Sequence, residues 1–413
     1  MNKTLCLYQL DPYMRSCDST VVSIIAEPET CLVLDKTIFF PEGGGQPSDT
    51  GFITCDFGTL DVTHVYERDG IVYHQIKNNN TAVKTLASIT GKHVTCKLNW
   101  ERRFTHMQRH CGEHILSSAF FELFGGINRG FHMGEDYMTI DINLEEKSEF
   151  TQMTDEMVNE AEWVSNQMVW SNLPVTVRRF KTREEAAMQP MRKALAIEDD
   201  IVIVCVGDVN KAAGCVACCG THPISTGEVG LIKIYRWENY KGMIRITFDA
   251  GPNALKHYRE ESALIKILNN RYSSDSKNLL RNIEIREEKN TNARQELYVF
   301  KQAYLKYKAE ELKNAKNDAD RVIIRKYELF KTEDLLSISK TLADISDKLI
   351  ALVSLKENTL ILLSGGVPDC NKIIKDNAPV WNGKGGGRPN SARVMFPSEE
   401  NLNCFLDYLK QAY

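Results

Sequence analysis

The pattern of apolar and polar positions predicts β-strands at the start of this 413-residue chain. Over residues 5–95, short runs rich in valine, isoleucine, threonine and aromatic residues alternate with turn signals such as EGGGQPSDTG and KNNNT. Alternation of this kind, interrupted by glycine, proline and asparagine, is typical of short strands joined by tight turns. We therefore expect a small N-terminal β-barrel domain over residues 1–98, which carries the glycine-rich loop.

The pattern changes to a mixture of helix and strand over residues 99–251. A helix is expected from residue 101 to the Gly125-Gly126 stop, and a second helix over residues 149–168. The runs IVIVCVGDV and VGLIKIYRWENYKGMIRITFDA predict further strands. This second region is expected to be an α+β domain.

The last two regions differ sharply in composition. Residues 253–348 contain no proline or glycine and are rich in lysine, glutamate, asparagine, leucine and isoleucine, which predicts a helical segment over residues 252–348. A single straight helix of that length would span about 140 Å, so we expect two or more antiparallel, coiled-coil-like helices that favour self-association. Residues 349–413 combine the apolar run TLILLSGG, the helix-like NKIIKDNA, a glycine-rich stretch and a closing helix, which predicts a small C-terminal α/β domain. The fold class is therefore α+β, multi-domain.

Composition narrows the functional classes. With 43% hydrophobic and 26% charged residues, the chain is neither wholly disordered nor fibrous. No apolar stretch approaches the ~18 residues of a membrane span, and the N-terminus lacks a signal-like run, so we expect a cytoplasmic protein with no membrane partner. A net charge of −4 provides no broad field for nucleic acid and leaves only local basic patches. Twelve cysteines without an export signal indicate reduced thiols and metal ligands rather than a disulfide framework.

Two pairs of ligand-type residues share the i, i+4 spacing. His106, His110 and His114 follow one face of the first predicted helix about one turn apart, so that two neighbours can hold one ion while the third is a packed or surface histidine. Cys218 and His222 repeat the spacing ahead of a glycine-rich turn. Together they form a nitrogen and sulfur donor set suited to Zn²⁺.

Alternatives to this ligand set remain within the same loop. Cys219 could replace Cys218, and Cys215 is either a buried thiol or a residue that supports a ligand. A structural zinc site closes with four protein ligands, whereas a catalytic site uses about three and leaves a position for water or substrate. The spacing does not decide between three and four ligands.

The motifs around these residues resemble the editing module of alanyl-tRNA synthetases and of their free-standing AlaX-type relatives. In that family a GGQxxDxG loop, an HxxxH helix and a CxxxH loop with TGxxGxxKI occur in this order. The matching segments here are FFPEGGGQPSDTG (39–51), HCGEH (110–114), CCGTH (218–222), TGEVGLIKI (226–234) and GMIRITFDAG (242–251). The resemblance covers about residues 1–250. The tail, with GKGGGRPNSA (383–392), resembles the C-terminal domain of alanyl-tRNA synthetase, which in that family helps dimerisation and tRNA binding.

The resemblance implies an aminoacyl-tRNA deacylase. The expected activity is zinc-dependent trans-editing of mischarged tRNA(Ala), chiefly Ser-tRNA(Ala) and secondly Gly-tRNA(Ala), without ATP-dependent aminoacylation, because no aminoacylation domain precedes the module. The implied zinc ligands are His110, His114, Cys218 and His222. Serine is favoured because a hydroxyl-reading site left unpaired by alanine loses about 1–3 kcal/mol. The alternative is a non-catalytic, zinc-containing tRNA-binding or regulatory protein.

Several further residues are candidates for the site. The backbone of Gly44 and Gly45 permits close approach, and Gln46 is expected either to donate to the seryl hydroxyl or carbonyl or to cap a turn. Cys111 stands where the family usually has threonine or serine, and we place it in the acyl site. Glu113 is expected in a salt bridge with a nearby arginine (Arg102, Arg103 or Arg109) rather than as a general base, and Asp49 is expected to bond nearby amides in a turn.

Clusters of basic residues are the candidate tRNA contacts. We expect phosphate contacts, or otherwise solvated surface charge, from arginines of the histidine helix (Arg102, Arg103, Arg109), from a second cluster (Arg178, Arg179, Lys181, Arg183) and from the C-terminal glycine-rich stretch (Lys384, Arg388, Arg393). The partner expected is tRNA(Ala), bound by a homodimer formed through the helical and C-terminal regions.

Overall fold

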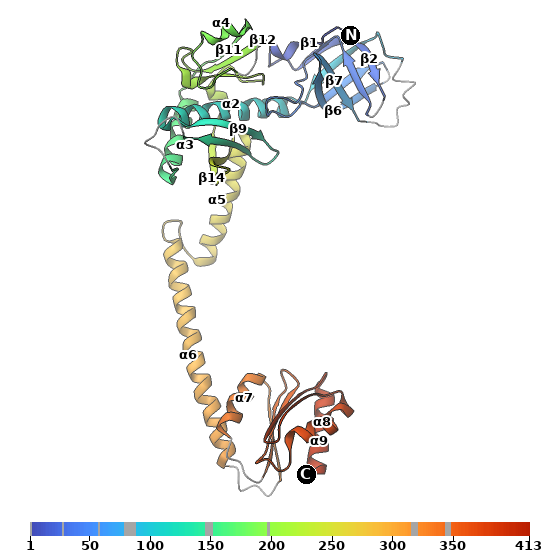
Figure 1. Ribbon diagram of the computed structural model, residues 1–413, viewed down its shortest axis with the longest axis vertical. Helices are drawn as coiled ribbons and strands as arrows, with labels where there is room; N and C mark the ends of the chain where they lie inside the picture. The colour runs from blue at the N-terminus through green and yellow to red at the C-terminus, as the bar shows by residue number, and fades with distance from the viewer. Residues whose placement is uncertain are drawn as a thin grey trace. The chain divides into compact units, whose positions relative to one another are not determined.

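The chain forms two compact units, Met1–Ile267 and Leu268–Tyr413 (Figure 1). In the described residues, no helix is both long and apolar enough to cross a membrane. The division into four domains expected from the sequence stays a prediction. The computed structural model describes residues 2–26, 29–56, 58–77, 88–144, 152–195, 199–314, 321–342 and 348–413.

Six antiparallel strands close into a barrel in the first unit, which confirms the predicted barrel. Their order is β2-β3-β7-β6-β5-β8, and the pairing of β8 with β2 closes the sheet. Alternate side chains point inward, so that Val94, Cys96 and Leu98 of β8 are buried and the residues between them are exposed. The strands are β2 (Ser16–Ile25), β3 (Cys31–Leu34), β5 (Gly51–Cys55), β6 (Gly58–Arg68), β7 (Ile71–Ile76) and β8 (His93–Leu98), and a separate parallel pair is β1 (Leu5–Cys6) with β4 (Lys36–Thr37).

Helix α2 (Trp100–Phe124) leaves the barrel and carries the three histidines. It begins where the side chain of Asn99 accepts a hydrogen bond from the Arg102 amide, and it ends at Gly125, whose φ of 65° is left-handed. The predicted stop at Gly125 is therefore confirmed. Most of the helix is buried, because α2 runs between a large sheet on one side and a small sheet on the other (Figure 1).

The large sheet is antiparallel, with the order β14-β15-β10-β9. Apolar residues of this sheet pack with α2 and α3 in one core, which includes Phe120 of α2 and Phe248 of β15. Helix α3 (Asp155–Trp170) starts after the cap Thr154, later than the predicted residue 149, and residues 149–151 of the predicted helix lie outside the described residues. The strands are β9 (Ile127–Met133), β10 (Met138–Asn143), β14 (Ile232–Tyr240) and β15 (Met243–Ala250).

The small sheet consists of β11 (Val175–Thr182), β12 (Asp199–Val206) and β13 (Cys215–Ala217), and the short helix α4 (Arg183–Ala187) follows β11. Cys205 and Cys215 face each other on neighbouring strands and form a disulfide. The expectation of reduced thiols throughout was wrong for this pair, because strand pairing brings together two residues that a local pattern does not relate. Single-turn 3-10 helices elsewhere in the chain are η1 (Leu7–Gln9), η2 (Ala212–Gly214), η3 (Thr226–Val229) and η5 (Ala378–Trp381).

The predicted helical segment is only partly helical. Helices α5 (Pro252–Tyr272) and α6 (Leu279–Asn314) occupy its first two thirds. The expectation of helix up to residue 348 was wrong, because Val322–Tyr327 forms strand β16, which pairs in parallel with β17 (Leu349–Ser354). A short helix, α7 (Thr332–Thr341), follows β16. The β-branched residues of β16 favour a strand once a partner strand is available.

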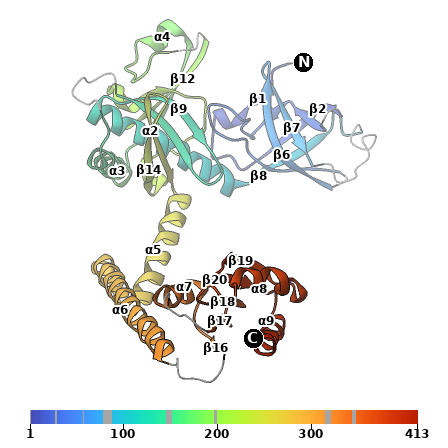
Figure 2. The ribbon, with the colours of Figure 1, turned by 60° about the horizontal axis from the view of Figure 1, so that its bottom comes forward.

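The C-terminal sheet has the order β16-β17-β18-β20-β19 and helices on both faces, as expected for a small α/β domain (Figure 2). Every residue of β17 is buried, since its side chains alternate between two cores. Ile350 and Leu352 face α7 and the end of α6, whereas Leu349, Ala351 and Val353 face α8 and α9. The remaining elements are β18 (Thr359–Leu363), α8 (Cys370–Asn377), β19 (Lys384–Arg388), β20 (Ser391–Met395) and α9 (Glu399–Ala412).

Candidate metal centre

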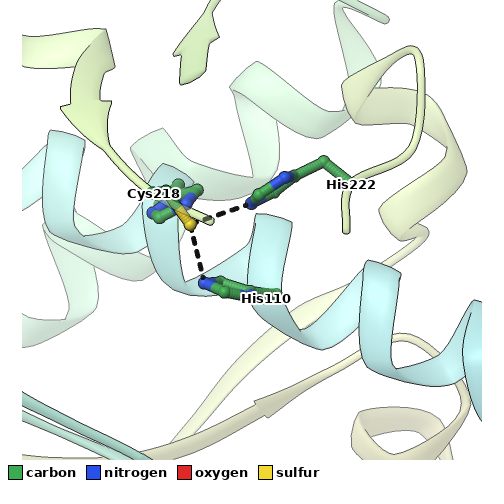
Figure 3. Close-up of side chains that lie close together, drawn as sticks. His110, Cys218 and His222 are labelled. Carbon is green, nitrogen blue, oxygen red and sulfur yellow. Dashed lines mark hydrogen bonds between the residues drawn. The ribbon is translucent and has the colours of Figure 1, made fainter. Parts of the chain in front are cut away.

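Four side chains from two distant segments meet beside helix α2. His110 and His114 lie one turn apart on α2, and Cys218 and His222 come from the loop after β13, where the Cys218 amide donates to the Val202 carbonyl of β12 at 2.9 Å. The candidate ligand atoms of all four residues lie within 4.8 Å of one another. The sulfur of Cys218 is 3.3 Å from Nε2 of His110 and 3.6 Å from Nε2 of His222 (Figure 3).

The donor chemistry of this group fits zinc. Bond lengths of about 2.0–2.3 Å at a tetrahedral ion separate neighbouring ligand atoms by roughly 3.3–3.6 Å, which agrees with both distances from Cys218. Within the described residues, both ring nitrogens of His114 are buried without a hydrogen bond of good geometry: Nδ1 lies beside Oε2 of Glu113 at 2.6 Å, and Nε2 has no polar partner. A buried nitrogen without a partner is costly, and a metal ion would satisfy it. Three imidazoles and one thiolate form a set of intermediate softness that suits Zn²⁺.

Burial also sets the protonation of these groups. Desolvation lowers the pKa of His110 to about 3 and the pKa of His222 well below its ordinary value, so both rings are neutral and able to bind a metal. Desolvation raises the pKa of Cys218, and the Gly220 amide opposes this by donating to the sulfur at 3.4 Å. A bound cation would further favour the thiolate.

His106 does not join the group. It is buried on α2, one turn before His110, and it lines a second cavity of about 480 Å³ together with Arg102 and Arg109. Burial, followed by the positive charges of neighbouring arginines, lowers its pKa to about 3. Of the three helix histidines, His106 is therefore the packed one.

Gln46 reaches the group but does not face the pocket. Its side chain is fully buried, its Oε1 lies 2.8 Å from Nδ1 of His110, and its Nε2 donates to the Thr221 hydroxyl at 2.9 Å. The sequence interpretation, in which this amide contacts the acyl group, does not fit an amide that is already engaged with protein on both sides. Thr221 had not been singled out from the sequence.

The two glycines before Gln46 allow close packing. Gly44 and Gly45 have φ of 61° and 82°, in the left-handed region. A Cβ on Gly44 would lie 3.0 Å from the sulfur of Cys219, and one on Gly45 would lie 2.7 Å from the ring of Phe131. The glycines thus permit approach to neighbouring protein segments, and Gly44 also lines the pocket beside the metal group.

Cys111 lies on another face of α2. It is fully buried in the core shared by α2 and the large sheet, and burial raises its pKa. Successive helix residues point about 100° apart, so a neighbour of His110 turns away from the group. The structure therefore places Cys111 in the core rather than in the acyl site.

Glu113 has partners other than those expected. Its Oε2 lies 2.6 Å from Nδ1 of His114, and its Oε1 accepts hydrogen bonds from Ser117 at 2.6 Å and Asn128 at 2.7 Å. The charge nearby is Arg192, 3.9 Å away, and not an arginine of α2. Burial acts to raise the pKa of Glu113, but His114 and Arg192 outweigh it and bring this pKa below its ordinary value. Arg192 lies in a loop with no recognisable motif, so sequence reasoning missed it.

Two of the predicted RNA-contacting arginines are internal. Arg103 is completely buried and pairs with Asp49, which also accepts a hydrogen bond from the Phe40 amide at 2.6 Å. Arg109 pairs with both oxygens of Asp249, at 2.7 and 2.8 Å. These guanidinium groups hold the fold together, so the expected phosphate contacts do not fit them. Asp49 bonds a nearby amide, as predicted.

The remaining basic candidates are more accessible. Arg102 is half-buried and donates to the Ser48 carbonyl at 3.0 Å, and Lys384 and Arg388 are exposed on β19. In the second cluster, Arg178 donates to Gln189 and Arg179 to Gln9.

A pocket of about 340 Å³ opens beside the metal group. His110, His114 and Cys218 contribute to its wall, together with apolar side chains such as Ile127 and Phe131. Exposed Arg129 and Lys193 also line it, although neither was singled out from the sequence. The arrangement can admit a small organic group next to a metal ion and place cationic side chains near its neighbours.

Two protein-family models match parts of this chain. The family model described as "tRNA synthetases class II (A)" matches residues 13–102, and the model "Threonyl and Alanyl tRNA synthetase second additional domain" matches residues 201–247, which include Cys218 and His222. The C-Ala domain of alanyl-tRNA synthetase from Aquifex aeolicus matches 22% of this chain and 87% of its own at 16% identity, with a TM-score of 0.20 that is too low to bear on the fold.

Curated relatives match over much longer stretches. The alanine–tRNA ligase of Methanobrevibacter smithii is 26% identical over 97% of this chain, which spans 45% of that enzyme, and the ligase of Pyrococcus furiosus is 31% identical over 64% of this chain and 28% of its own length. The alanyl-tRNA editing protein AlaX-L of Pyrococcus horikoshii is 30% identical over 98% of both chains. The chain therefore belongs to the AlaX-L family of alanyl-tRNA editing proteins.

Proposed function

We propose that this protein is a zinc-dependent trans-editing hydrolase that deacylates mischarged tRNA(Ala), chiefly Ser-tRNA(Ala) and secondly Gly-tRNA(Ala). The observation that carries the proposal is the convergence of His110, His114, Cys218 and His222 beside a pocket of about 340 Å³, three of which (His110, His114 and Cys218) line its wall. The editing relative that matches over 98% of both chains supports the substrate class.

The chemistry required is hydrolysis of an ester. Zinc held by these four residues would polarise the carbonyl or activate a water molecule. The protein itself orients its ligands: Gln46 contacts Nδ1 of His110, and Glu113 contacts Nδ1 of His114. Because both oxygens of Glu113 have protein partners, we assign it to holding His114 rather than to removing a proton from water.

The rim of the pocket suits the end of an RNA. Arg129 and Lys193 are exposed beside the ligands, and positive side chains at such an opening favour phosphates that follow an acylated terminal nucleoside. In the second unit, Lys384 and Arg388 are exposed on β19 and are the proposed remote contacts with tRNA. Arg102 is the remaining candidate on α2.

A stripe on helix α6 supports self-association. Exposed apolar residues recur with alternating spacings of three and four, which is the seam pattern of paired helices. We propose that a second copy covers them in a homodimer. Changing Phe300 to Asp should shift the full protein to a monomer in sedimentation, whereas Leu329→Asp, which lies outside the stripe, should not. The stripe residues are Leu297, Phe300, Tyr304 and Tyr307.

The test of function is release of amino acid from preformed Ser-, Gly- and Ala-tRNA(Ala) by the full-length protein. Serine release that is fast, lost in chelator and restored by zinc is the expected result, with His110→Ala as the inactive control. Metal-bound protein that binds tRNA(Ala) but releases no amino acid would instead indicate a non-catalytic tRNA-binding protein.

A further inference from the structure

We infer that Gln46 is a positioning residue that fixes the tautomer and orientation of His110, and thereby prepares the metal group for its ion. The inference rests on the part of the proposed function that assigns a metal to this group. It gives the N-terminal barrel a role at the site, because Gln46 lies in a loop of residues 43–46 closed by two backbone hydrogen bonds between Gly43 and Gln46, at 3.0 and 3.1 Å.

The orientation of the Gln46 amide follows from its partners. The backbone N–H of Thr221 points at one atom of this amide from 3.1 Å, and a backbone N–H can only donate. That atom must be the oxygen, Oε1. The nitrogen, Nε2, then donates to the Thr221 hydroxyl at 2.9 Å, so a single residue of the CCGTH loop holds both ends of the amide.

The orientation of the amide determines the tautomer of His110. Oε1 can only accept, so the ring nitrogen 2.8 Å from it, Nδ1 of His110, must carry the proton. In a neutral imidazole the other nitrogen then has the lone pair. That nitrogen, Nε2, lies 3.3 Å from the sulfur of Cys218, on the side where the four ligand atoms converge.

Gly220 closes the other side of the ring. A Cβ at this position would lie 2.2 Å from Cε1 of His110 and 2.8 Å from Oε1 of Gln46. Only hydrogen fits there, so the backbone of the ligand loop packs directly on the imidazole and its hydrogen-bond partner. His110 is therefore held between a side chain from the barrel loop and the backbone of the loop that carries Cys218 and His222.

The same contacts connect both halves of the metal group. Gln46 bonds to His110 on α2 and to Thr221, which is the residue before the ligand His222. Loss of the Gln46 amide would free the His110 ring to take the other tautomer, in which a proton occupies Nε2. Residues that hold a metal-binding histidine in this way typically contribute 10–100-fold to metal affinity.

The test compares two buried glutamines in the full-length protein. Gln46→Met keeps the length of the side chain and removes both hydrogen-bonding groups. Gln108→Met makes the same change on α2, where Nε2 of Gln108 donates to the Glu228 carbonyl at 2.7 Å away from the four ligands. Zinc affinity is measured by competition with a coloured chelator, and the His110 tautomer by long-range ¹H–¹⁵N NMR of the metal-free protein.

We expect Gln46→Met to weaken zinc binding by about 10–100-fold and to populate both tautomers of His110. Gln108→Met should leave both readouts unchanged. Gln46→Glu retains an acceptor oxygen and should therefore keep the Nδ1–H tautomer of His110. If Gln46→Met does not fold, Gln46→Glu is measured in its place. Unchanged zinc affinity with a single Nδ1–H tautomer in Gln46→Met would overturn the inference.

Activity separates this inference from the alternative in which Gln46 reads the acyl group. At saturating zinc, a positioning role predicts slower deacylation with an unchanged ratio of serine to alanine release. A changed ratio with unchanged zinc affinity would assign Gln46 to the substrate and refute the inference. If the wild-type protein binds zinc but hydrolyses no aminoacyl-tRNA, the proposed function fails while the zinc and tautomer measurements still decide the role of Gln46.

Discussion

The carboxylate of Glu113 lies 2.6 Å from Nδ1 of His114, although the two residues are neighbours on one helix. Ser117 and Asn128 hold the other carboxylate oxygen, so that the whole group is fixed. A carboxylate beside a metal-binding histidine sets the ring orientation and makes the ring a better ligand. Arg192, which comes from a loop, lies 3.9 Å from Oε1 of the same glutamate and donates to the His114 carbonyl at 3.2 Å.

Changing Glu113 to glutamine should therefore weaken the metal site. If the remaining oxygen keeps its hydrogen bonds from Ser117 and Asn128, the new NH₂ group points toward His114. A donor in that place disfavours a proton on Nδ1 of His114. We expect zinc affinity to fall by about 10–100-fold, measured by chelator competition. The control is Glu101→Gln, a change of an exposed glutamate on the same helix. Equal affinities in both variants would contradict a role in orienting His114.

The two adjacent cysteines should behave differently. Cys218 belongs to the four-residue group, whereas Cys219 is exposed and does not. Cys218→Ala should lose most of its zinc and its deacylation activity, and Cys219→Ala should retain about one zinc per chain, measured by elemental analysis. Loss of zinc from the Cys219 variant alone would instead identify the other thiol as the ligand.

The buried pair Arg103–Asp49 should contribute to stability rather than to RNA binding. Arg103→Met leaves the Asp49 carboxylate without its counter-charge in a fully buried place, which costs about 3–5 kcal/mol. Urea denaturation of the zinc-saturated protein measures this change. The exposed pair Lys92–Asp56, at 3.4 Å, provides the control, because Lys92→Met should cost less than about 1 kcal/mol. If Arg103→Met lowers the free energy of unfolding no more than Lys92→Met does, the buried pair is dispensable for stability.

His74 should make the barrel sensitive to acid. Burial lowers its pKa to about 4 from an ordinary value of 6.5, so between these values the unfolded chain binds a proton that the folded chain does not. The contribution of His74 to the free energy of unfolding is therefore fully present above about pH 6.5. As the pH falls toward 4, this contribution is lost, by about 3 kcal/mol in total.

Denaturation of the wild type and of His74→Gln across this pH range tests the prediction. The wild type should lose about 3 kcal/mol more than the variant between pH 6.5 and 4. The exposed His93→Gln serves as the control. Parallel pH profiles for the wild type and His74→Gln would contradict the assignment.

The exposed cations of β19 should contribute to tRNA affinity. Replacement of Lys384 and Arg388 together by alanine removes two proposed phosphate contacts, which lowers the salt dependence of binding by a slope of about 1–2. Filter binding at several salt concentrations measures this slope. Lys340 and Lys410 are also exposed in the same unit and provide a control of equal charge. If both double variants lower the salt dependence equally, the loss reflects net charge alone and contradicts specific phosphate contacts from Lys384 and Arg388.

Local patterns predicted much of the fold. Alternating apolar residues predicted the barrel, and the Gly125-Gly126 pair predicted the end of α2, because strand and helix periodicities depend on near neighbours in the chain. Residues 322–327 show the limit of this reasoning. Without glycine or proline they were interpreted as helix, but pairing with β17 makes them a strand.

The candidate site shows the same division. The i, i+4 spacing and the family motifs pointed to His110, His114, Cys218 and His222, and the structure brings these four together. For the residues around these four, the structure differs from the sequence predictions: Gln46 faces His110, Cys111 lies in the core and Arg103 is buried. Arg192 carried no local signal, and Thr221, although it lies within the CCGTH motif, was not singled out.

The sequence by itself therefore determined the elements and the residue types that can hold a metal, because helix spacing and ligand chemistry are properties of short segments. Tertiary structure alone decided which ring nitrogen of His110 carries the proton, which glutamate and arginine lie beside His114, and which cysteines pair. The physical reason is that hydrogen bonds and ion pairs depend on distances of about 3 Å between atoms, and residues 64 or 175 positions apart reach such distances only after the chain has folded.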